Sequence, residues 1–173
     1  LADFITALRA HQSATALGLE FLILTAGRVS EVTKATWDEV DLENRLWKIP
    51  ADRMKGGRVH RVPLSERAVE ILERTKLNGR SDYLFPGANT KKHLSENAFR
   101  VFILNTMGCR DVTAHGFRST FRDWCAERTN YPREVAEMAL AHAVGSAVEA
   151  AYRRGDLFAK RARLMEEWAR YCD

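Results

Sequence analysis

The feature that most constrains the fold of this chain is an apolar run over residues 17–26, in which Glu20 is the one charged residue. Ten residues are too few to cross a bilayer as a helix. The sequence contains no uncharged apolar run of greater length. A helix that is apolar on every side has to be surrounded by other elements of the protein. The run therefore predicts a buried helix in a globular protein, with no membrane span.

The composition of the 173 residues agrees with one compact domain, because 46% are hydrophobic and 29% are charged. A chain of this length can bury a sizeable core without disulfides. Its three cysteines, Cys109, Cys125 and Cys172, are odd in number and form no C-x-x-C pair. We therefore expect neither a disulfide scaffold nor a zinc knuckle, and we expect a reducing, cytoplasmic location. Because the first residue is Leu1 rather than Met, we also expect a fragment of a longer protein.

The charge of the chain is mildly basic, with a formal net charge of +4 and a pI near 9.1. Basic side chains concentrate in three stretches, at residues 53–61, 74–92 and 153–163. A basic surface favours a polyanionic partner, although a solvated face explains most stretches of this kind. The charge therefore indicates a preference for a polyanion without identifying one.

Hydrophobic periodicity divides the chain into helical segments around one short β region. Three runs rich in Trp, Val and Ile replace the helical spacing at residues 37–41, 45–49 and 58–62. We expect these runs to pair as a small three-stranded antiparallel sheet in a mainly α protein. The expected helices are residues 3–17, 17–25, 30–36, 65–77, 95–107, 113–129 and 132–142, a short helix from residue 145 and a terminal helix from residue 156.

Six polar residues in distinctive local contexts form the candidate site: Arg28, Lys55, His115, Arg118, His142 and Tyr152. Together they supply two guanidiniums, one ammonium, two imidazoles and one phenol. These groups can hold a phosphodiester, attack its phosphorus and protonate the leaving oxygen without a metal. Each residue also has an ordinary structural explanation.

Arg28 follows the buried run and a glycine, and Glu31 lies three residues further on. Arg28 either holds a phosphate, oriented by Glu31, or forms an ion pair that stabilises a turn. His115 and Arg118 have a helical spacing of three and could grip two oxygens of one phosphate from one face. Alternatively, they are a capping histidine and a surface arginine. Lys55 precedes two glycines in a hairpin loop and is either a proton donor or a solvated turn lysine.

His142 lies at a helix end among small residues, where a histidine at the edge of the core is the common explanation. Tyr152 lies between two alanines and the basic pair Arg153 and Arg154. Neighbouring cations would stabilise its phenolate. None of the other three tyrosines lies between a small-residue helix and a basic pair, so Tyr152 is the candidate nucleophile.

Other chemistries have little support in the sequence. The chain has no G-x-S-x-G, no H-E-x-x-H and no Gly-Lys-Ser/Thr loop. Two histidines without a carboxylate or thiolate at ligand spacing do not form a metal site, and Asp111, Asp123 and Glu127 form no two-metal cluster. We therefore expect no metal and no other cofactor, which disfavours a metal-dependent nuclease.

The order and context of these residues resemble the catalytic domain of tyrosine recombinases, the phage integrase family, and most of all the integrases of prophages and genomic islands. The resemblance rests on Leu24-Thr-Ala-Gly-Arg-Val-Ser-Glu31, Trp47-Lys-Ile-Pro50, Met54-Lys-Gly-Gly-Arg58, Val62-Pro-Leu-Ser65, Leu84-Phe-Pro86, Thr113-Ala-His-Gly-Phe-Arg118, Leu140-Ala-His142 and Ala150-Ala-Tyr-Arg-Arg154. These stretches span nearly the whole chain. One departure is Ala141, where many members have glycine. Because alanine is small, we expect little harm there and at most a local difference in the turn.

The resemblance implies a role for each candidate. Tyr152 would attack a DNA phosphodiester, forming a 3′-phosphotyrosyl link and releasing a 5′-hydroxyl. Arg28 and Arg118 would hold the non-bridging oxygens, and Lys55 would protonate the leaving 5′-oxygen. His115 would act as acid and base toward the tyrosine, and His142 would donate a hydrogen bond to the phosphate. Glu31 would be a supporting residue, and the implied DNA contacts are Arg58, Arg61, Arg153 and Arg154.

The resemblance also implies that residues 1–173 are a single C-terminal catalytic domain, with N-terminal core-binding and arm-binding domains absent from this chain. The implied function is site-specific integration and excision of a mobile element. The implied partners are double-stranded DNA at attachment sites, further integrase protomers (a tetramer in the synapse, a monomer alone) and accessory DNA-bending proteins. Two alternatives stay open: a type IB topoisomerase-like enzyme without synapsis, and a DNA-binding regulator that has lost catalysis.

Overall fold

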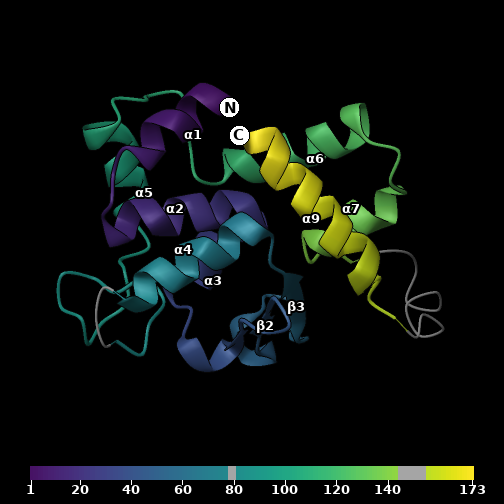
Figure 1. Ribbon diagram of the computed structural model, residues 1–173, viewed down its shortest axis with the longest axis horizontal. Helices are drawn as coiled ribbons and strands as arrows, with labels where there is room; N and C mark the ends of the chain where they lie inside the picture. Colours follow the sequence, from purple (N-terminus) through teal and green to yellow (C-terminus); the bar gives the residue numbers. More distant parts are fainter. Residues whose placement is uncertain (78–80, 144–154) are drawn as a thin grey trace.

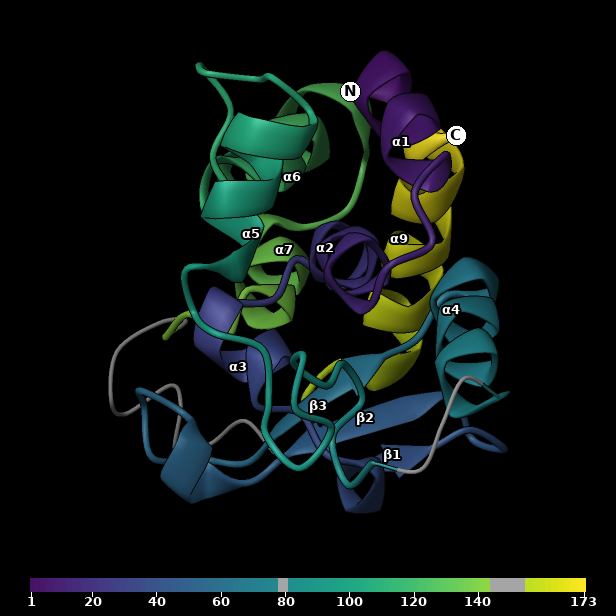
Figure 2. The same cartoon turned by 90° about the vertical axis from the view of Figure 1, so that its left-hand side faces the viewer.

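A central helix, α2 (Ala14–Thr25), organises the fold of the computed structural model, which describes residues 1–77, 81–143 and 155–173. Figure 1 gives the arrangement of the elements, and Figure 2 looks along α2, which other helices enclose on both sides. Every residue of α2 from Ala16 to Thr25 is buried. The predicted buried helix is thus confirmed, and each of its large apolar side chains contributes about 1.5–3 kcal/mol by leaving water.

The other helices of the described residues pack around α2. They are α1 (Ala2–Arg9), α3 (Val29–Thr33), α4 (Glu66–Leu77), α5 (Ala98–Val101), the π-helical η3 (Phe102–Thr106), α6 (Gly116–Arg128), α7 (Arg133–Ala139) and α9 (Phe158–Cys172). None of the helices in the described ranges combines the length and the apolar character that a bilayer span requires.

A three-stranded antiparallel sheet lies at one end of the molecule, below α2 in Figure 2. Its strands are β1 (Val40–Asp41), β2 (Leu46–Ile49) and β3 (His60–Pro63), in the order β1-β2-β3. Trp47 pairs with Val62, and both are buried, whereas their neighbours Lys48 and Arg61 are exposed. This alternation has the period of two that a sheet with one buried face requires, and it confirms the predicted sheet.

The first predicted strand is shorter than expected. Residues 37–39 form a 3-10 helix, η1 (Trp37–Glu39), before β1 begins. The turn places the buried carboxylate of Glu39 where its Oε2 accepts a hydrogen bond from Trp47 Nε1 at 2.9 Å. A buried indole N–H needs such a partner, which accounts for the departure from an extended strand.

Two predicted helix boundaries differ from the structure, and a serine hydroxyl lies at each of them. Residues 3–17 do not form one helix, since Ser13 caps α2 with its hydroxyl and separates it from α1. In the segment predicted at residues 95–107, the Ser95 hydroxyl accepts from the backbone N–H of Asn97 at 3.2 Å. The helix there begins two residues later than a serine cap would place it.

The predicted helix that ends at His142 is also shorter than expected. It begins after Pro132 as predicted, but α7 ends at Ala139 because Ala141 adopts a left-handed φ of 52°. A left-handed residue cannot continue a right-handed helix. The short helix expected from residue 145, with Tyr152, lies outside the described residues.

The terminal helix α9 packs against α2, α7 and β3 of the same chain. The predicted terminal helix is confirmed, and Leu164, Met165 and Trp168 form its buried side. Trp168 Nε1 also donates to the backbone carbonyl of Ile23 in α2, at 2.8 Å. α9 therefore covers one side of the central helix (Figure 2).

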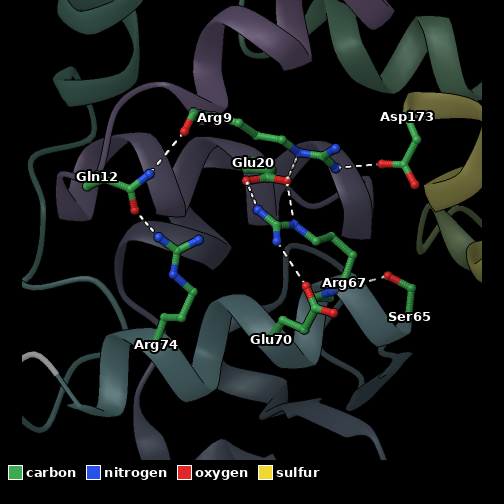
Figure 3. Close-up of polar contacts among 9 residues, drawn as sticks. Arg9, Gln12, Glu20, Ser65, Arg67, Glu70, Arg74 and Asp173 are labelled. Carbon is green, nitrogen blue, oxygen red and sulfur yellow. Dashed lines mark hydrogen bonds and ion pairs between the residues drawn. The ribbon is translucent and has the colours of Figure 1, made fainter.

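The one charge in the central helix is paired by two arginines (Figure 3). Glu20 is 2% exposed and accepts from Arg9 Nε at 2.7 Å and from Arg67 Nε at 2.9 Å. Arg9 also forms an ion pair with Asp173, at 2.7 Å. The hydrogen bond to Glu20 raises the pKa of Arg67, and the burial of Arg67 opposes this rise. A buried carboxylate requires partners of this kind, and here they join α1, α2, α4 and the end of α9.

Candidate active site

Arg28 lies at the N-cap of α3, directly after the glycine that follows the central helix. Its Nη1 forms an ion pair with Glu31 Oε1 at 2.6 Å, and its backbone N–H donates to Glu31 Oε2 at 2.9 Å. The Glu31 side chain is 4% exposed, whereas that of Arg28 is 27% exposed. The expected ion pair is therefore present, and it orients the guanidinium while part of the group stays accessible to a ligand.

Arg118, on α6, is buried and joins the ends of two other helices. Its Nη2 donates to the carbonyl oxygen of Leu140 at 2.8 Å, after α7, and its Nη1 donates to the carbonyl oxygen of Ala26, after α2. Carbonyls at helix C-termini lack partners within the helix and have partial negative charge. Arg118 therefore satisfies one carbonyl at each helix end and fixes α2, α6 and α7 relative to one another.

The two guanidiniums meet at one carbonyl oxygen. Arg28 Nη2 also donates to Leu140, at 3.5 Å, so that both arginines share this acceptor. Burial lowers the pKa of Arg118 to about 10; the positive charge of Arg28 acts in the same direction and Glu31 opposes it. Because two cations lie close together in a partly desolvated place, a bound anion such as a phosphate oxygen would offset their repulsion.

His142 lies beside this arginine pair. Its Nε2 is 3.5 Å from Arg118 Nη2, and its Nδ1 is 2.6 Å from Glu137 Oε2. Glu137 Oε1 accepts from Arg122 Nε at 2.9 Å. Glu137 is a residue that the sequence pattern did not single out, although it gives His142 a carboxylate partner. The signal in the sequence is an acid five residues before the histidine, across a helix end.

The turn between α7 and His142 has the hydrogen bonds of a Schellman motif. The His142 N–H donates to the Glu137 carbonyl at 2.9 Å, and the Ala141 N–H donates to the Met138 carbonyl at 3.1 Å. Ala141 occupies the left-handed position, which glycine adopts without strain. With alanine at this position the turn is formed, and it contains one strained residue.

Lys55 lies in an exposed turn that is anchored next to the Arg28–Glu31 pair. Gly57 closes the turn with a left-handed φ of 60°. At the base of the turn, Arg53 Nη2 donates to the backbone carbonyl of Glu31 at 2.5 Å. The loop is therefore tied to the residue that orients Arg28, while Lys55 itself is exposed to solvent.

His115 is exposed at the N-cap of α6, whereas Arg118 points into the protein. The helix expected from residue 113 begins at Gly116, and in the turn ahead of it the Thr113 hydroxyl accepts from the Gly116 N–H at 3.0 Å. The two side chains that were expected on one face thus differ in exposure. The reason is that residue 115 precedes the first turn of the helix, and Arg118 is held by carbonyls on other helices.

His60, on β3, is a second residue that the sequence pattern did not single out. Burial lowers the pKa of His60 to about 4, and the charges of Arg161 and Arg28 act in the same direction. The backbone of Ala139, beside the shared carbonyl of Leu140, acts to raise the pKa of His60. The pKa of about 4 means that the imidazole of His60 is neutral at neutral pH.

The remaining candidates lie at the edge of this cluster or beyond the described residues. Arg58 is exposed in the loop before β3. Arg61 lies 3.4 Å from Asp156, and its guanidinium is 4.3 Å from the centre of the Phe158 ring, so it joins β3 to the start of α9. The residues that lie outside the described ranges are Tyr152, Arg153 and Arg154.

The sequence matches the model of the Phage integrase family over residues 1–157. It is 39% identical over 150 residues to the prophage integrase IntA of Escherichia coli K12, and this alignment covers 85% of this chain and 36% of that protein. It is 33% identical over 161 residues to the integrase of Shigella phage Sf6, and this alignment covers 91% of this chain and 41% of that protein. The chain thus spans about two fifths of the length of these relatives.

Among solved structures, the integrase from mycobacterium phage Brujita has a similar fold. The TM-score is 0.71 at 21% sequence identity, and the match covers 95% of this chain and 55% of that chain. The expected fold, mainly helical with a three-stranded antiparallel sheet, is confirmed. With a family match over most of its length and curated relatives that cover most of it, the chain belongs to the phage integrase family.

Proposed function

We propose that this chain is the C-terminal catalytic domain of a tyrosine recombinase, which cleaves and rejoins DNA strands in the integration and excision of a mobile element. The observation that supports this most is the meeting of Arg28 and Arg118 at one carbonyl oxygen, with His142 beside them. Guanidiniums offer planar pairs of donors that match phosphate oxygens, and burial strengthens such contacts. The relatives are named integrases, which agrees with this chemistry.

In the proposed reaction the Tyr152 oxygen attacks the phosphorus of a DNA phosphodiester. The phenolic proton passes to His115, the bond from phosphorus to the 5′-oxygen breaks, and Lys55 gives that oxygen a proton. The products are a 3′-phosphotyrosyl link and a free 5′-hydroxyl. Arg28 and Arg118 hold the non-bridging oxygens and stabilise the charge of the pentacoordinate phosphorus.

Rejoining reverses these steps with the 5′-hydroxyl of another strand. The covalent link preserves the energy of the phosphodiester, so no nucleotide cofactor is consumed. His142 donates a hydrogen bond to the phosphate during both halves of the reaction. Glu31 supports Arg28, as its ion pair at 2.6 Å suits it to do.

The proposed setting is double-stranded DNA in a bacterial cytoplasm. Core-binding and arm-binding domains, in a longer protein, would complete the clamp around DNA, and a tetramer of protomers would form the synapse, with accessory DNA-bending proteins. Arg58, Arg61, Arg153 and Arg154 would contact phosphates. The chain by itself should bind DNA weakly and with a strong dependence on salt, because phosphate contacts release counterions.

The proposal is tested with nicked suicide duplexes of randomised sequence, which trap a covalent intermediate because the cleaved fragment diffuses away. We expect a protein–DNA adduct that survives denaturation in the parent chain, and none in Tyr152→Phe. Tyr171→Phe is the matched control, since Tyr171 lies on α9 against Trp168 and should leave the adduct unchanged. An adduct in Tyr152→Phe would show that the nucleophile is another residue.

Two further measurements separate the alternatives. Exchange of strands between two marked duplexes distinguishes a recombinase from a topoisomerase-like enzyme, which recloses the same strand. Full cleavage in EDTA distinguishes the proposed mechanism from a metal-dependent nuclease. Binding of DNA without any cleavage would favour a regulator.

A further inference from the structure

Glu137 connects α6 and α7 beside the candidate site. Its Oε1 accepts from Arg122 Nε at 2.9 Å and lies 3.6 Å from Arg133 Nε, and its Oε2 lies 2.6 Å from His142 Nδ1. Burial by itself would raise the pKa of the Glu137 carboxyl. The hydrogen bonds from His142 and Arg122 outweigh this effect, so the pKa of the carboxyl is lowered overall. An ionised carboxylate can only accept hydrogen bonds. His142 Nδ1 is therefore the donor and holds a proton.

This bond decides which nitrogen of His142 faces the arginines. With Nδ1 on Glu137, the opposite nitrogen, Nε2, lies 3.5 Å from Arg118 Nη2. The backbone N–H of His142 also donates to the Glu137 carbonyl at 2.9 Å, so the same two residues are linked twice. The two nitrogens of a histidine differ in role according to the partner of each.

We propose that Glu137 is a positioning residue, which holds His142 with Nδ1 protonated so that Nε2 is the nitrogen presented to the phosphate at Arg28 and Arg118. The inference rests on the proposed function and adds a residue to it. When the ring is doubly protonated, it keeps the bond to Glu137 and offers Nε2–H to a phosphate oxygen. A buried carboxylate orients the histidine of serine hydrolases in the same way. Glu137 itself touches no reacting atom.

Arg122 makes the substitution of Glu137 informative. In Glu137→Gln the side chain has one acceptor oxygen and one donor NH2 group. Because Arg122 can only donate, the oxygen must face Arg122 and the NH2 group must face His142. Nδ1 then becomes the acceptor, and the proton of the neutral ring moves to Nε2. A substitution that preserves shape is thus expected to reverse the tautomer.

The tautomer is measured on the full chain with 15N-labelled histidine, by two-bond 1H–15N correlation spectra at a pH where the ring is neutral. We expect the Nδ1–H pattern for His142 in the parent chain and the Nε2–H pattern in Glu137→Gln. Glu134→Gln, one turn earlier on α7, is the matched control and should keep the parent pattern. The double variant Arg122→Leu, Glu137→Gln should shift the ring back toward Nδ1–H, because only the more distant Arg133, at 3.6 Å, then favours the amide oxygen on that side.

The second readout is the rate of covalent adduct formation on the suicide duplex. Glu137→Gln should lower this rate about 10- to 100-fold, the range seen for partners that orient metal-bound histidines, because the neutral amide no longer stabilises the doubly protonated ring that donates Nε2–H to the phosphate. The double variant should recover part of this loss. An unchanged tautomer in Glu137→Gln, or a reversed tautomer with an unchanged rate, would overturn the inference. If the parent chain forms no adduct, the proposed function fails, while the spectra still decide whether Glu137 positions the ring.

Discussion

Arg28 and Arg118 donate to the same oxygen, the backbone carbonyl of Leu140, although one precedes α3 and the other lies in α6. The pair of arginines that we propose to hold the phosphate is therefore assembled on the end of a third helix, α7. A change that moves this helix end moves both guanidiniums. The consequences can be measured residue by residue.

Arg118→Lys should destabilise the fold by about 1–3 kcal/mol, because an ammonium cannot reproduce a planar fork between two carbonyls and one of them would be left unpaired. Urea unfolding measures the loss as a lower midpoint. The control is Arg128→Lys, an exposed arginine in the last turn of the same helix, which should change stability by less than about 0.5 kcal/mol. Equal midpoints for the two variants would contradict the joining role of Arg118.

Ala141→Gly should stabilise the protein by about 0.5–1 kcal/mol. Alanine in a left-handed conformation costs about 1–2 kcal/mol, and the greater freedom of glycine in the unfolded chain offsets part of the gain. Thermal unfolding of the variant should show a higher Tm. Ala139→Gly, two residues earlier in the right-handed part of α7, should lower it. A decrease for both variants would show that the turn at residue 141 is not strained.

His60 should make folding stability depend on pH below neutrality. Its pKa is lowered to about 4 in the folded chain and is about 6.5 when unfolded. The unfolded chain therefore binds the extra proton first as the pH falls. The contribution of neutral His60 to the free energy of unfolding is fully present above about pH 6.5. It is lost as the pH falls to about 4, and the loss is about 3 kcal/mol at most.

The pH effect is isolated by comparing the parent chain with His60→Gln in urea unfolding at several pH values. Contributions from all other groups are shared and cancel in the difference. We expect the parent to lose more stability than the variant between pH 6.5 and pH 4. Parallel curves would mean that His60 titrates alike in the folded and unfolded chains.

Arg53→Ala should loosen the loop that presents Lys55. Arg53 pairs with the buried carboxylate of Glu39 and donates to the Glu31 carbonyl, so its removal leaves both acceptors short of a partner. We expect a loss of about 2 kcal/mol in unfolding free energy and slower adduct formation at a temperature where the variant stays folded. Asp52→Ala, an exposed neighbour in the same turn, η2 (Ala51–Arg53), should preserve stability.

Features that depend on neighbours in the sequence were predictable. Ser65 caps α4 as expected, with its hydroxyl accepting from the Ala68 N–H at 3.3 Å, because a cap needs a polar side chain only three residues away. The Arg28–Glu31 pair has the same spacing and was expected on that ground. The three strands followed from runs of alternating side chains. In each case the interacting groups lie within one turn or one hairpin.

Features that depend on distant backbone were not predictable. The Leu140 carbonyl as a shared acceptor and the anchoring of Arg53 on Glu31 join segments far apart in the chain. A backbone carbonyl is present in every residue, so a sequence pattern cannot indicate which one is left unpaired at a helix end. Glu137 was missed for a related reason, since its partner lies past the end of its helix.

The sequence by itself determined the central buried helix, the mainly helical fold with a small sheet, the family and the candidate residues, because hydrophobic periodicity and ordered motifs are local properties of a chain. The tertiary structure alone decided that Arg118 is buried between two helix ends, that Arg28 meets it at Leu140 and that Glu137 orients His142. Those contacts require helices to pack at fixed positions. Packing depends on shape and burial throughout the domain, which no short motif specifies.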